Sequence, residues 1–97
     1  MKTAAQVKDE YLCKQEERVS EYLNDFTDNF VGLSQTYTEE ELVELWGQYD
    51  FEDCNLVLEA LTSDKLGFSV RCYKTKEKVG IFGKDFRIVY HYEISAK

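Results

Sequence analysis

The chain has 97 residues, of which 43% are hydrophobic and 14% aromatic, and its formal net charge is −7 at pH 7. This length supports one domain with a modest core, and the apolar content excludes a disordered acidic chain. We therefore expect a single domain over residues 1–97 with acidic side chains on a folded body. No segment has the length of a membrane span (about eighteen apolar residues) or the apolar stretch of a signal peptide, so we expect a soluble, cytoplasmic protein without a membrane partner.

The charge is unevenly distributed along the chain. Residues 1–65 carry sixteen acids against five bases, whereas residues 66–97 carry three acids against seven bases. Between Arg18 and Lys65 there are twelve carboxylates and no Lys or Arg. Such a polarised charge repels nucleic acid from the acidic side and attracts basic partners to it.

The amino-terminal segment is predicted to form a long amphipathic helix from about residue 3 to residue 30. Apolar side chains recur on one helical face, and Val7 and Tyr11 extend this stripe toward the amino end. The polar stretch 14–18 allows a break, and Gly32 is interpreted as the glycine that ends the helix. An exposed part of the stripe could pack against a second copy, so a homodimer through this helix is one hypothesis.

Two shorter helices are predicted next. Thr38 and Glu41 have the spacing of a capping box, which indicates a helix that begins at Thr38 and ends at Gly47. A third helix is predicted over about residues 51–62, with Asp50 as its N-cap. Its apolar face comprises Cys54, Leu58 and Leu61.

From Gly67 onward, apolar residues alternate with polar ones, which is typical of strands. Strands are predicted at 68–73, 79–82 and 86–94, joined by a polar hairpin tip at 74–78 and a tight turn at 83–85. The predicted fold class is α+β, with three amino-terminal helices followed by a three-stranded antiparallel meander and the helices on one face of the sheet.

Residues 38–73 resemble a winged helix-turn-helix domain. The stretch 38–47 is similar to the first helix and turn glycine of that family, Cys54, Leu58 and Leu61 to the buried face of its second helix, and 66–68 to the start of its wing strands. The resemblance implies a second helix that enters the DNA major groove with its first residues. Three of these positions are carboxylates, which repel phosphates, so we do not expect DNA recognition through this helix. They are Asp50, Glu52 and Asp53.

The basic residues of the predicted hairpin offer another contact with nucleic acid. Lysines at a hairpin with a nearby aromatic residue, Tyr73, can hold a nucleic-acid backbone or a single strand. Lysines also make a hairpin soluble and blunt an edge strand, and both interpretations stay open here. The candidate contact residues are Arg71, Lys74, Lys76 and Lys78.

Catalysis, metal binding and cofactors find little support in the sequence. The one histidine, His91, lies in a predicted strand without a nucleophile motif beside it. The three cysteines, at positions 13, 54 and 72, lack the short-spaced pair of a zinc site, and we interpret them as reduced, mostly buried thiols. We therefore expect no catalytic residue, metal or cofactor, and a protein that is not an enzyme.

The acidic surface itself has two interpretations. It can serve solubility alone, but the pair Glu40 and Glu44 lies four residues apart without a compensating lysine, which slightly destabilises a helix. The hypothesis we prefer is docking on a basic groove, with candidate contacts at Glu40, Glu44, Asp50, Glu52, Asp53 and Glu59.

This hypothesis predicts a small, acidic, non-enzymatic protein-binding module, an inhibitor or adaptor that docks on a basic nucleic-acid-handling protein. In size and charge the chain resembles DNA-mimic proteins of phages and mobile elements. It predicts no direct binding of nucleic acid. The alternative is a winged-helix nucleic-acid-binding transcriptional regulator that uses the basic hairpin.

Overall fold

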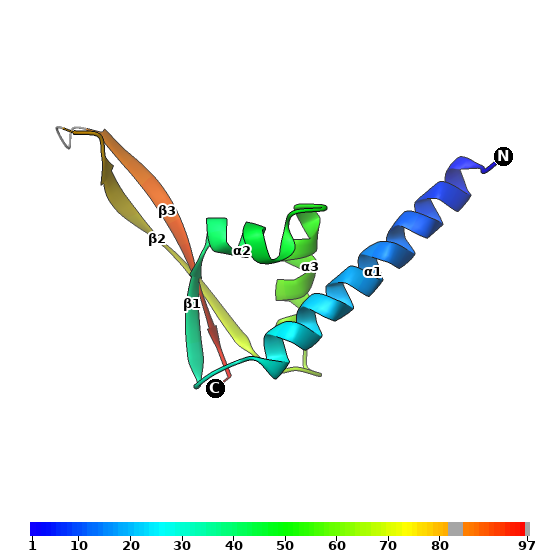
Figure 1. Ribbon diagram of the computed structural model, residues 1–97. Helices are drawn as coiled ribbons and strands as arrows, with labels where there is room; N and C mark the ends of the chain where they lie inside the picture. The colour runs from blue at the N-terminus through cyan, green and yellow to red at the C-terminus, as the bar shows by residue number, and fades with distance from the viewer. Residues whose placement is uncertain (82–84, 97) are drawn as a thin grey trace.

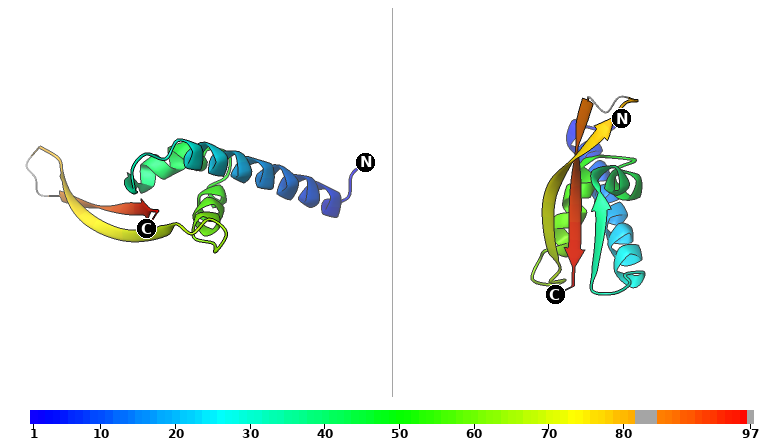
Figure 2. Two further views of the ribbon diagram at one scale, coloured as in Figure 1. Left: turned by 90° about the horizontal axis from the view of Figure 1, so that it is seen from below. Right: turned by 90° about the vertical axis from the view of Figure 1, so that its left-hand side faces the viewer.

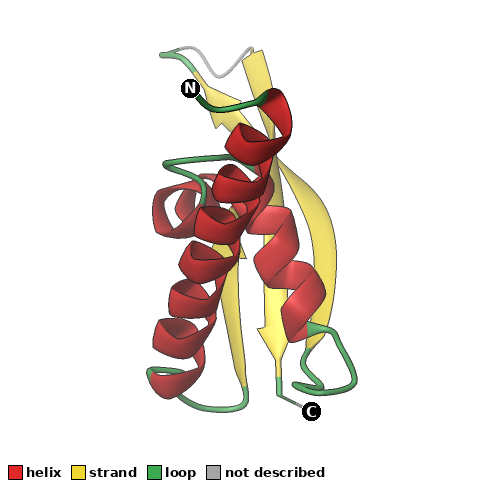
Figure 3. Cartoon of the chain, turned by 90° about the vertical axis from the view of Figure 1, so that its right-hand side faces the viewer, coloured by secondary structure: helices red, strands yellow, loops and turns green. Residues whose placement is uncertain are grey.

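The chain folds into three helices and a three-stranded antiparallel sheet, in a computed structural model that describes residues 1–81 and 85–96. The elements are α1 (Ala4–Asp28), β1 (Ser34–Thr38), α2 (Glu39–Trp46), α3 (Glu52–Leu61), β2 (Ser69–Val79) and β3 (Asp85–Ser95). The helices lie on one face of the sheet (Figures 1 and 3). The predicted α+β class is confirmed in these described residues.

The long first helix is uninterrupted over 25 residues, so the break allowed at 14–18 does not occur. Thr3 and Gln6 form a capping box at its start, and Asn29 follows its last residue. Gly32, with φ of 78°, lies in the connection to β1 instead of ending the helix. The amino-terminal part of α1 projects away from the other elements (Figure 1), which leaves Tyr11 about half exposed.

The strands depart from the prediction in two ways. β1 was not expected, so the order of helices followed by strands is only partly correct, and the sheet order β1-β3-β2 is not a sequential meander. The polar stretch 74–78 is not a hairpin tip, because it continues β2, which ends at Val79. Of the predicted strand 79–82, Val79 is the last residue of β2, whereas residues 80 and 81 are in a bend and a turn, so a separate strand beginning at Val79 is wrong; residues 82–84 lie outside the described residues.

The core lies where the carboxyl-terminal half of α1 meets α2, α3 and the part of the sheet around Ile94. Phe26 is its aromatic centre, since its ring contacts Phe30 and Trp46 edge-on at 5.4 Å between centroids. Burial of each such side chain contributes about 1.5–3 kcal/mol, so this cluster holds the helices to the sheet. Its buried apolar members are Phe26, Leu42, Trp46, Cys54, Val57, Leu61 and Ile94.

The β2–β3 hairpin extends well beyond this core (Figures 1 and 2). On the same face of β3, Ile94 is fully buried and Tyr92 is half-buried against the core, whereas Tyr90, Ile88 and Phe86 are exposed. Residues that face each other across an antiparallel pair share one side of the sheet, so three lysines of β2 lie on this same face. The opposed pairs are Lys74 with Tyr90, Lys76 with Ile88, and Lys78 with Phe86.

Candidate docking surface

The amino end of α2 carries the predicted capping box, which is confirmed. The backbone N–H of Glu41 donates to Thr38 Oγ1 at 3.3 Å, and the Glu41 carboxylate accepts from the backbone N–H of Thr38 at 3.2 Å. Glu39 and Glu40 complete an acidic first turn, where the positive end of the helix dipole favours carboxylates. Of these three acids, Glu41 is thus engaged in capping the helix.

Asp53 is the one candidate carboxylate that does not lie on the surface. It is fully buried between α1 and α3, where it accepts a hydrogen bond from Gln15 Nε2 at 3.0 Å. Arg18 Nε approaches the other carboxylate oxygen at 2.9 Å, and this bond raises the pKa of Arg18. The assignment of Asp53 to a partner-binding surface therefore has to be corrected: this side chain joins two helices.

Asp50 lies at the start of α3 and is half-buried. The residue directly before the helix is Phe51, which makes no capping bond with its side chain. Asp50 Oδ1 instead accepts from the backbone N–H of Glu52 at 3.0 Å, and Gln15 Nε2 lies 3.3 Å from Asp50 Oδ2. The predicted N-cap is therefore displaced by one residue, although the side chain still satisfies a free N–H of the helix.

The other four candidate carboxylates are exposed on α2 and α3. Glu40 lies 3.7 Å from Arg87 of the hairpin, an ion pair open to solvent. Within residues 1–81 and 85–96, Glu44, Glu52 and Glu59 take part in no ion pair. Negative charge on these helices is therefore largely uncompensated.

Two aromatic residues that the sequence analysis did not select lie among these acids. Tyr49 is 81% exposed and Phe51 is 55% exposed, and in the turn between α2 and α3 they alternate with Asp50 and Glu52. The Arg18 guanidinium lies 5.6 Å from the Tyr49 ring centroid. The sequence could have indicated their exposure, because neither residue belongs to the apolar stripe of a neighbouring helix. Exposed aromatic residues of this kind are enriched at protein interfaces.

The candidate basic residues of the hairpin divide between its two faces. Arg71 is in an ion pair with Glu93 at 3.4 Å and lies against the Tyr73 ring. Lys74, Lys76 and Lys78 point to the other face, and in the described residues they form no ion pair. The structure thus separates Arg71 from the three lysines.

The remaining groups with reactive side chains are held apart. His91 stacks on Tyr73 with ring centroids 5.0 Å apart, and its Nε2 lies 2.8 Å from Thr75 Oγ1. Cys54 is buried, which raises the pKa of its thiol, whereas Cys13 and Cys72 are exposed, so the expectation of mostly buried thiols is wrong for those two. No cluster of three His, Cys, Asp or Glu side chains suited to a metal ion occurs in the described part of the chain.

Comparison of the chain with protein-family models, curated proteins and solved structures gave no match. None of the helices described here has both the length and the apolar character needed to cross a bilayer. The class of protein must therefore be inferred from the surfaces themselves.

Proposed function

We propose that the protein is a non-enzymatic binding module that docks on a basic protein. The proposed contact is the α2–α3 acidic surface, which we define as Glu40, Glu44, Tyr49, Asp50, Phe51, Glu52 and Glu59. The observation that supports it is the exposed aromatic pair between uncompensated carboxylates at the turn from α2 to α3. A purely solubilising surface has no need of exposed Tyr49 and Phe51.

The two kinds of residue have different tasks in such a contact. Carboxylates on a charge-polarised molecule steer a basic partner and raise the association rate about ten- to a thousand-fold at low salt. Aromatic side chains supply the buried area that keeps the complex together. Proteins that handle nucleic acid carry basic grooves that such a surface could occupy. We therefore infer that the protein is an inhibitor or adaptor that acts as a DNA mimic.

A winged helix-turn-helix arrangement is the finer fold assignment that we propose. It is supported by the adjacent helices α2 and α3 and by the long β2–β3 ribbon after them. The first turn of α3 exposes Glu52 beside Asn55 and buries Asp53, and Glu59 lies farther along the helix. These acids favour a protein partner over DNA for the helix that reads DNA in that family.

A capture experiment with two matched variants tests the docking proposal. Glu44→Lys/Glu52→Lys/Glu59→Lys reverses three charges on the α2–α3 acidic surface, and Glu16→Lys/Glu17→Lys/Glu21→Lys reverses three exposed charges on α1. Tagged proteins are incubated with nuclease-treated host lysate at low and moderate salt. We expect the wild type and the α1 variant to retain one stoichiometric basic protein that the α2–α3 variant loses. Retention by both variants, or by none of the three proteins, contradicts the proposal.

Direct binding of nucleic acid by the hairpin is a second candidate function. It is favoured by Lys74, Lys76 and Lys78, which form no ion pair with any described residue and each lie opposite an apolar or aromatic residue of β3. Titration with a labelled single-stranded oligonucleotide tests it, because three phosphate contacts give a slope of log K against log salt of about −2. Lys74→Gln/Lys76→Gln/Lys78→Gln is expected to abolish binding, and Lys2→Gln/Lys8→Gln/Lys14→Gln is the control of equal charge. No binding at low salt rejects this function.

A further inference from the structure

One edge of β3 is only partly covered. β1 pairs with the carboxyl-terminal half of β3, from Ser34 opposite Ser95 to Thr38 opposite His91. After Thr38 the chain turns into α2. Residues 85–90 of β3 therefore have β2 on one side and no strand of the described chain on the other.

The register shows which backbone groups face this open edge. The N–H of Ala96 donates to the carbonyl of Leu33 at 2.8 Å, so even-numbered residues near the end of β3 direct their backbone groups toward β1. Backbone groups alternate between the two sides of an antiparallel strand, and the register continues without a bulge. The N–H and C=O groups of Phe86, Ile88 and Tyr90 therefore point to the open edge, while Arg87 and Val89 pair with β2.

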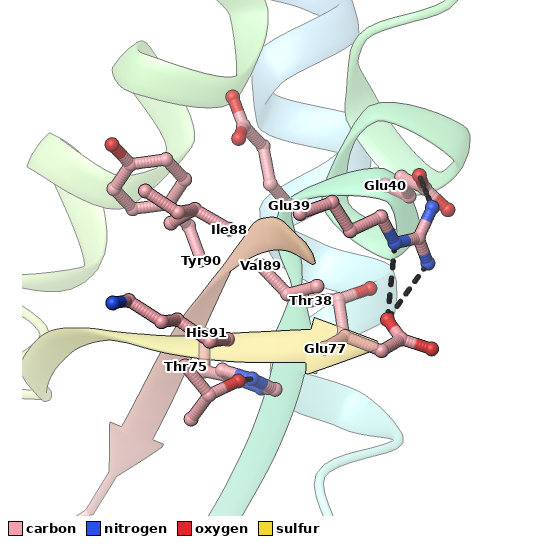
Figure 4. Close-up of a pocket in the computed structure, with 11 residues that line it drawn as sticks. Thr38, Glu39, Glu40, Thr75, Glu77, Ile88, Val89, Tyr90 and His91 are labelled. Carbon is pink, nitrogen blue, oxygen red and sulfur yellow. Dashed lines mark hydrogen bonds and ion pairs between the residues drawn. The ribbon is translucent and has the colours of Figure 1, made fainter. Parts of the chain in front are cut away.

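A cavity of about 400 Å³ lies beside this edge and reaches the start of α2 (Figure 4). Residues 38–40 border it at the start of α2, and residues 87–91 of β3 and 75–77 of β2, among them Lys76, border it on the sheet side. Arg87 is held between Glu77, at 3.0 Å, and Glu40, at 3.7 Å, along the same cavity. Glu39 is half-buried and, in the described residues, is in no ion pair.

We propose that the open edge of β3, residues 85–90, binds an extended peptide segment of a partner in line with β1. The peptide adds a strand to the sheet through main-chain hydrogen bonds to Phe86, Ile88 and Tyr90. It carries alternating basic and apolar residues. A lysine or arginine pairs with Glu39 while its aliphatic stem packs on Ile88 and Tyr90, and apolar residues on the other face meet Val89.

This edge is better suited to a peptide than the outer edge of β2. β2 carries Lys74, Lys76 and Lys78 along its length, and lysines on an edge strand discourage pairing. The open edge of β3 is six residues long and ends against α2, which limits unspecific pairing. The contact uses none of Glu44, Glu52 and Glu59, so it stands apart from the proposed function, and the α2–α3 charge-reversal variant is expected to keep it.

Amide hydrogen exchange on the free protein, followed by NMR, tests the geometry. We expect the N–H groups of Phe86, Ile88 and Tyr90 to exchange at least tenfold faster than those of Arg87 and Val89, because only the latter are paired with β2. Equal protection of both sets means that the edge is already covered, and it overturns the proposal.

Three model peptides then test the binding itself. The probe is acetyl-(Lys-Val)3-amide, and its controls are the same peptide N-methylated at alternate backbone nitrogens and an acetyl-(Glu-Val)3-amide peptide. We expect the probe at millimolar concentration to shift and protect the amides of Phe86, Ile88 and Tyr90. N-methylation should weaken binding at least tenfold, and the acidic peptide should not bind.

A protein variant completes the test without threatening the fold. Glu39→Gln is expected to weaken binding of the lysine peptide severalfold, whereas Glu44→Gln, on the same helix, leaves it unchanged. The proposal is overturned by absence of any shift, by equal binding of the N-methylated or the acidic peptide, or by shifts confined to the α2–α3 acidic surface.

Discussion

Glu52 and Asp53 are adjacent carboxylates in very different surroundings. Glu52 is exposed, whereas Asp53 is fully buried with Gln15 and Arg18 as partners. Removal of one member of a buried ion pair costs about 3–5 kcal/mol because the other members lose their counter-charge or hydrogen bond. We expect Asp53→Ala to lower the free energy of unfolding by about 3 kcal/mol, and Glu52→Ala to change it by less than about 0.5 kcal/mol.

Denaturant unfolding followed by the fluorescence of Trp46, the only tryptophan, measures both changes. Trp46 lies in the core, so its signal reports the packing that Asp53 supports. If Asp53→Ala and Glu52→Ala lower the free energy of unfolding equally, the structural role that we assign to Asp53 is wrong.

The buried thiol of Cys54 gives a prediction about pH. Burial and the nearby Asp53 raise the pKa of this thiol above its ordinary value, so the folded state holds the proton more tightly than the unfolded state. The resulting stabilisation is present below the unfolded-state pKa and is lost as the pH rises through the folded-state pKa. As the pH rises from neutral through the ordinary range of a thiol and above it, the wild type should therefore lose stability more steeply than Cys54→Ala. Parallel profiles of stability against pH for the two proteins contradict this prediction.

The exposure of the cysteines gives a separate prediction. In the folded protein a thiol reagent should react rapidly with Cys13 and Cys72, which are exposed, and slowly with the buried Cys54.

Gly47 follows the last residue of α2 at a position that has no room for a side chain. Its φ of −105° is open to any residue, so a left-handed conformation is not the reason for glycine. A Cβ at this position would lie 3.0 Å from Cys54 Sγ and 3.1 Å from the Val43 Cα. We expect Gly47→Ala to lower the free energy of unfolding by about 1–3 kcal/mol through overpacking.

Cys54→Ala removes the sulfur atom from this contact, so it supplies the control for Gly47→Ala. In the double variant we expect part of the loss to be recovered, which appears as a coupling free energy in a double-mutant cycle of denaturation measurements. Additive effects of the two substitutions show instead that Val43 and the backbone alone exclude the side chain.

Some of the helices and strands could be predicted from the sequence, and others could not. The three helices were predictable because their apolar residues recur with a helical period and Thr38 and Glu41 form a local cap. β1 was not, because its sequence Ser-Gln-Thr-Tyr-Thr has no apolar alternation and is held in place by β3. The lysines at 74–78 looked like a tip because a strand beyond the core needs no alternating burial.

The candidate surface was predictable only in part, for a similar reason. The acids were visible as a charge pattern, but the burial of Asp53 depends on Gln15 and Arg18, which precede it by 38 and 35 residues. A local sequence pattern cannot predict hydrogen-bond partners that are so far apart in the chain. The exposure of Tyr49 and Phe51 likewise follows from how α2 and α3 pack on α1 and the sheet.

The whole molecule is elongated, with extents of 58 × 35 × 19 Å and a radius of gyration of 16.8 Å. A compact domain of this length has a radius of gyration of about 12–13 Å. The projecting part of α1 and the β2–β3 hairpin extend toward opposite ends of the molecule (Figure 1), and in this part of α1 Val7, Tyr11 and Leu12 are each about half exposed. An exposed apolar stripe of this kind keeps the homodimer hypothesis open as a prediction.

If two copies pair through α1, the mass measured by light scattering should rise toward that of a dimer with increasing protein concentration. Leu12→Lys should then restore the monomer mass, because it places a charge in the stripe. Glu17→Lys, an exposed charge change on the same helix, is the control. A monomer mass at every concentration rejects the dimer.

The central position of β3 has a consequence for the order in which the chain acquires its structure. β3 is the last strand in the sequence, yet it is the only described strand that touches both of the others. During synthesis β1 and β2 therefore emerge before the strand that pairs with both of them, and Ile94 is missing from the core until the residues before it have all been made. The nascent chain can form helices as it leaves the ribosome, but the sheet can assemble only after β3 has been made, with long-range pairings such as Gln35 to Ile94.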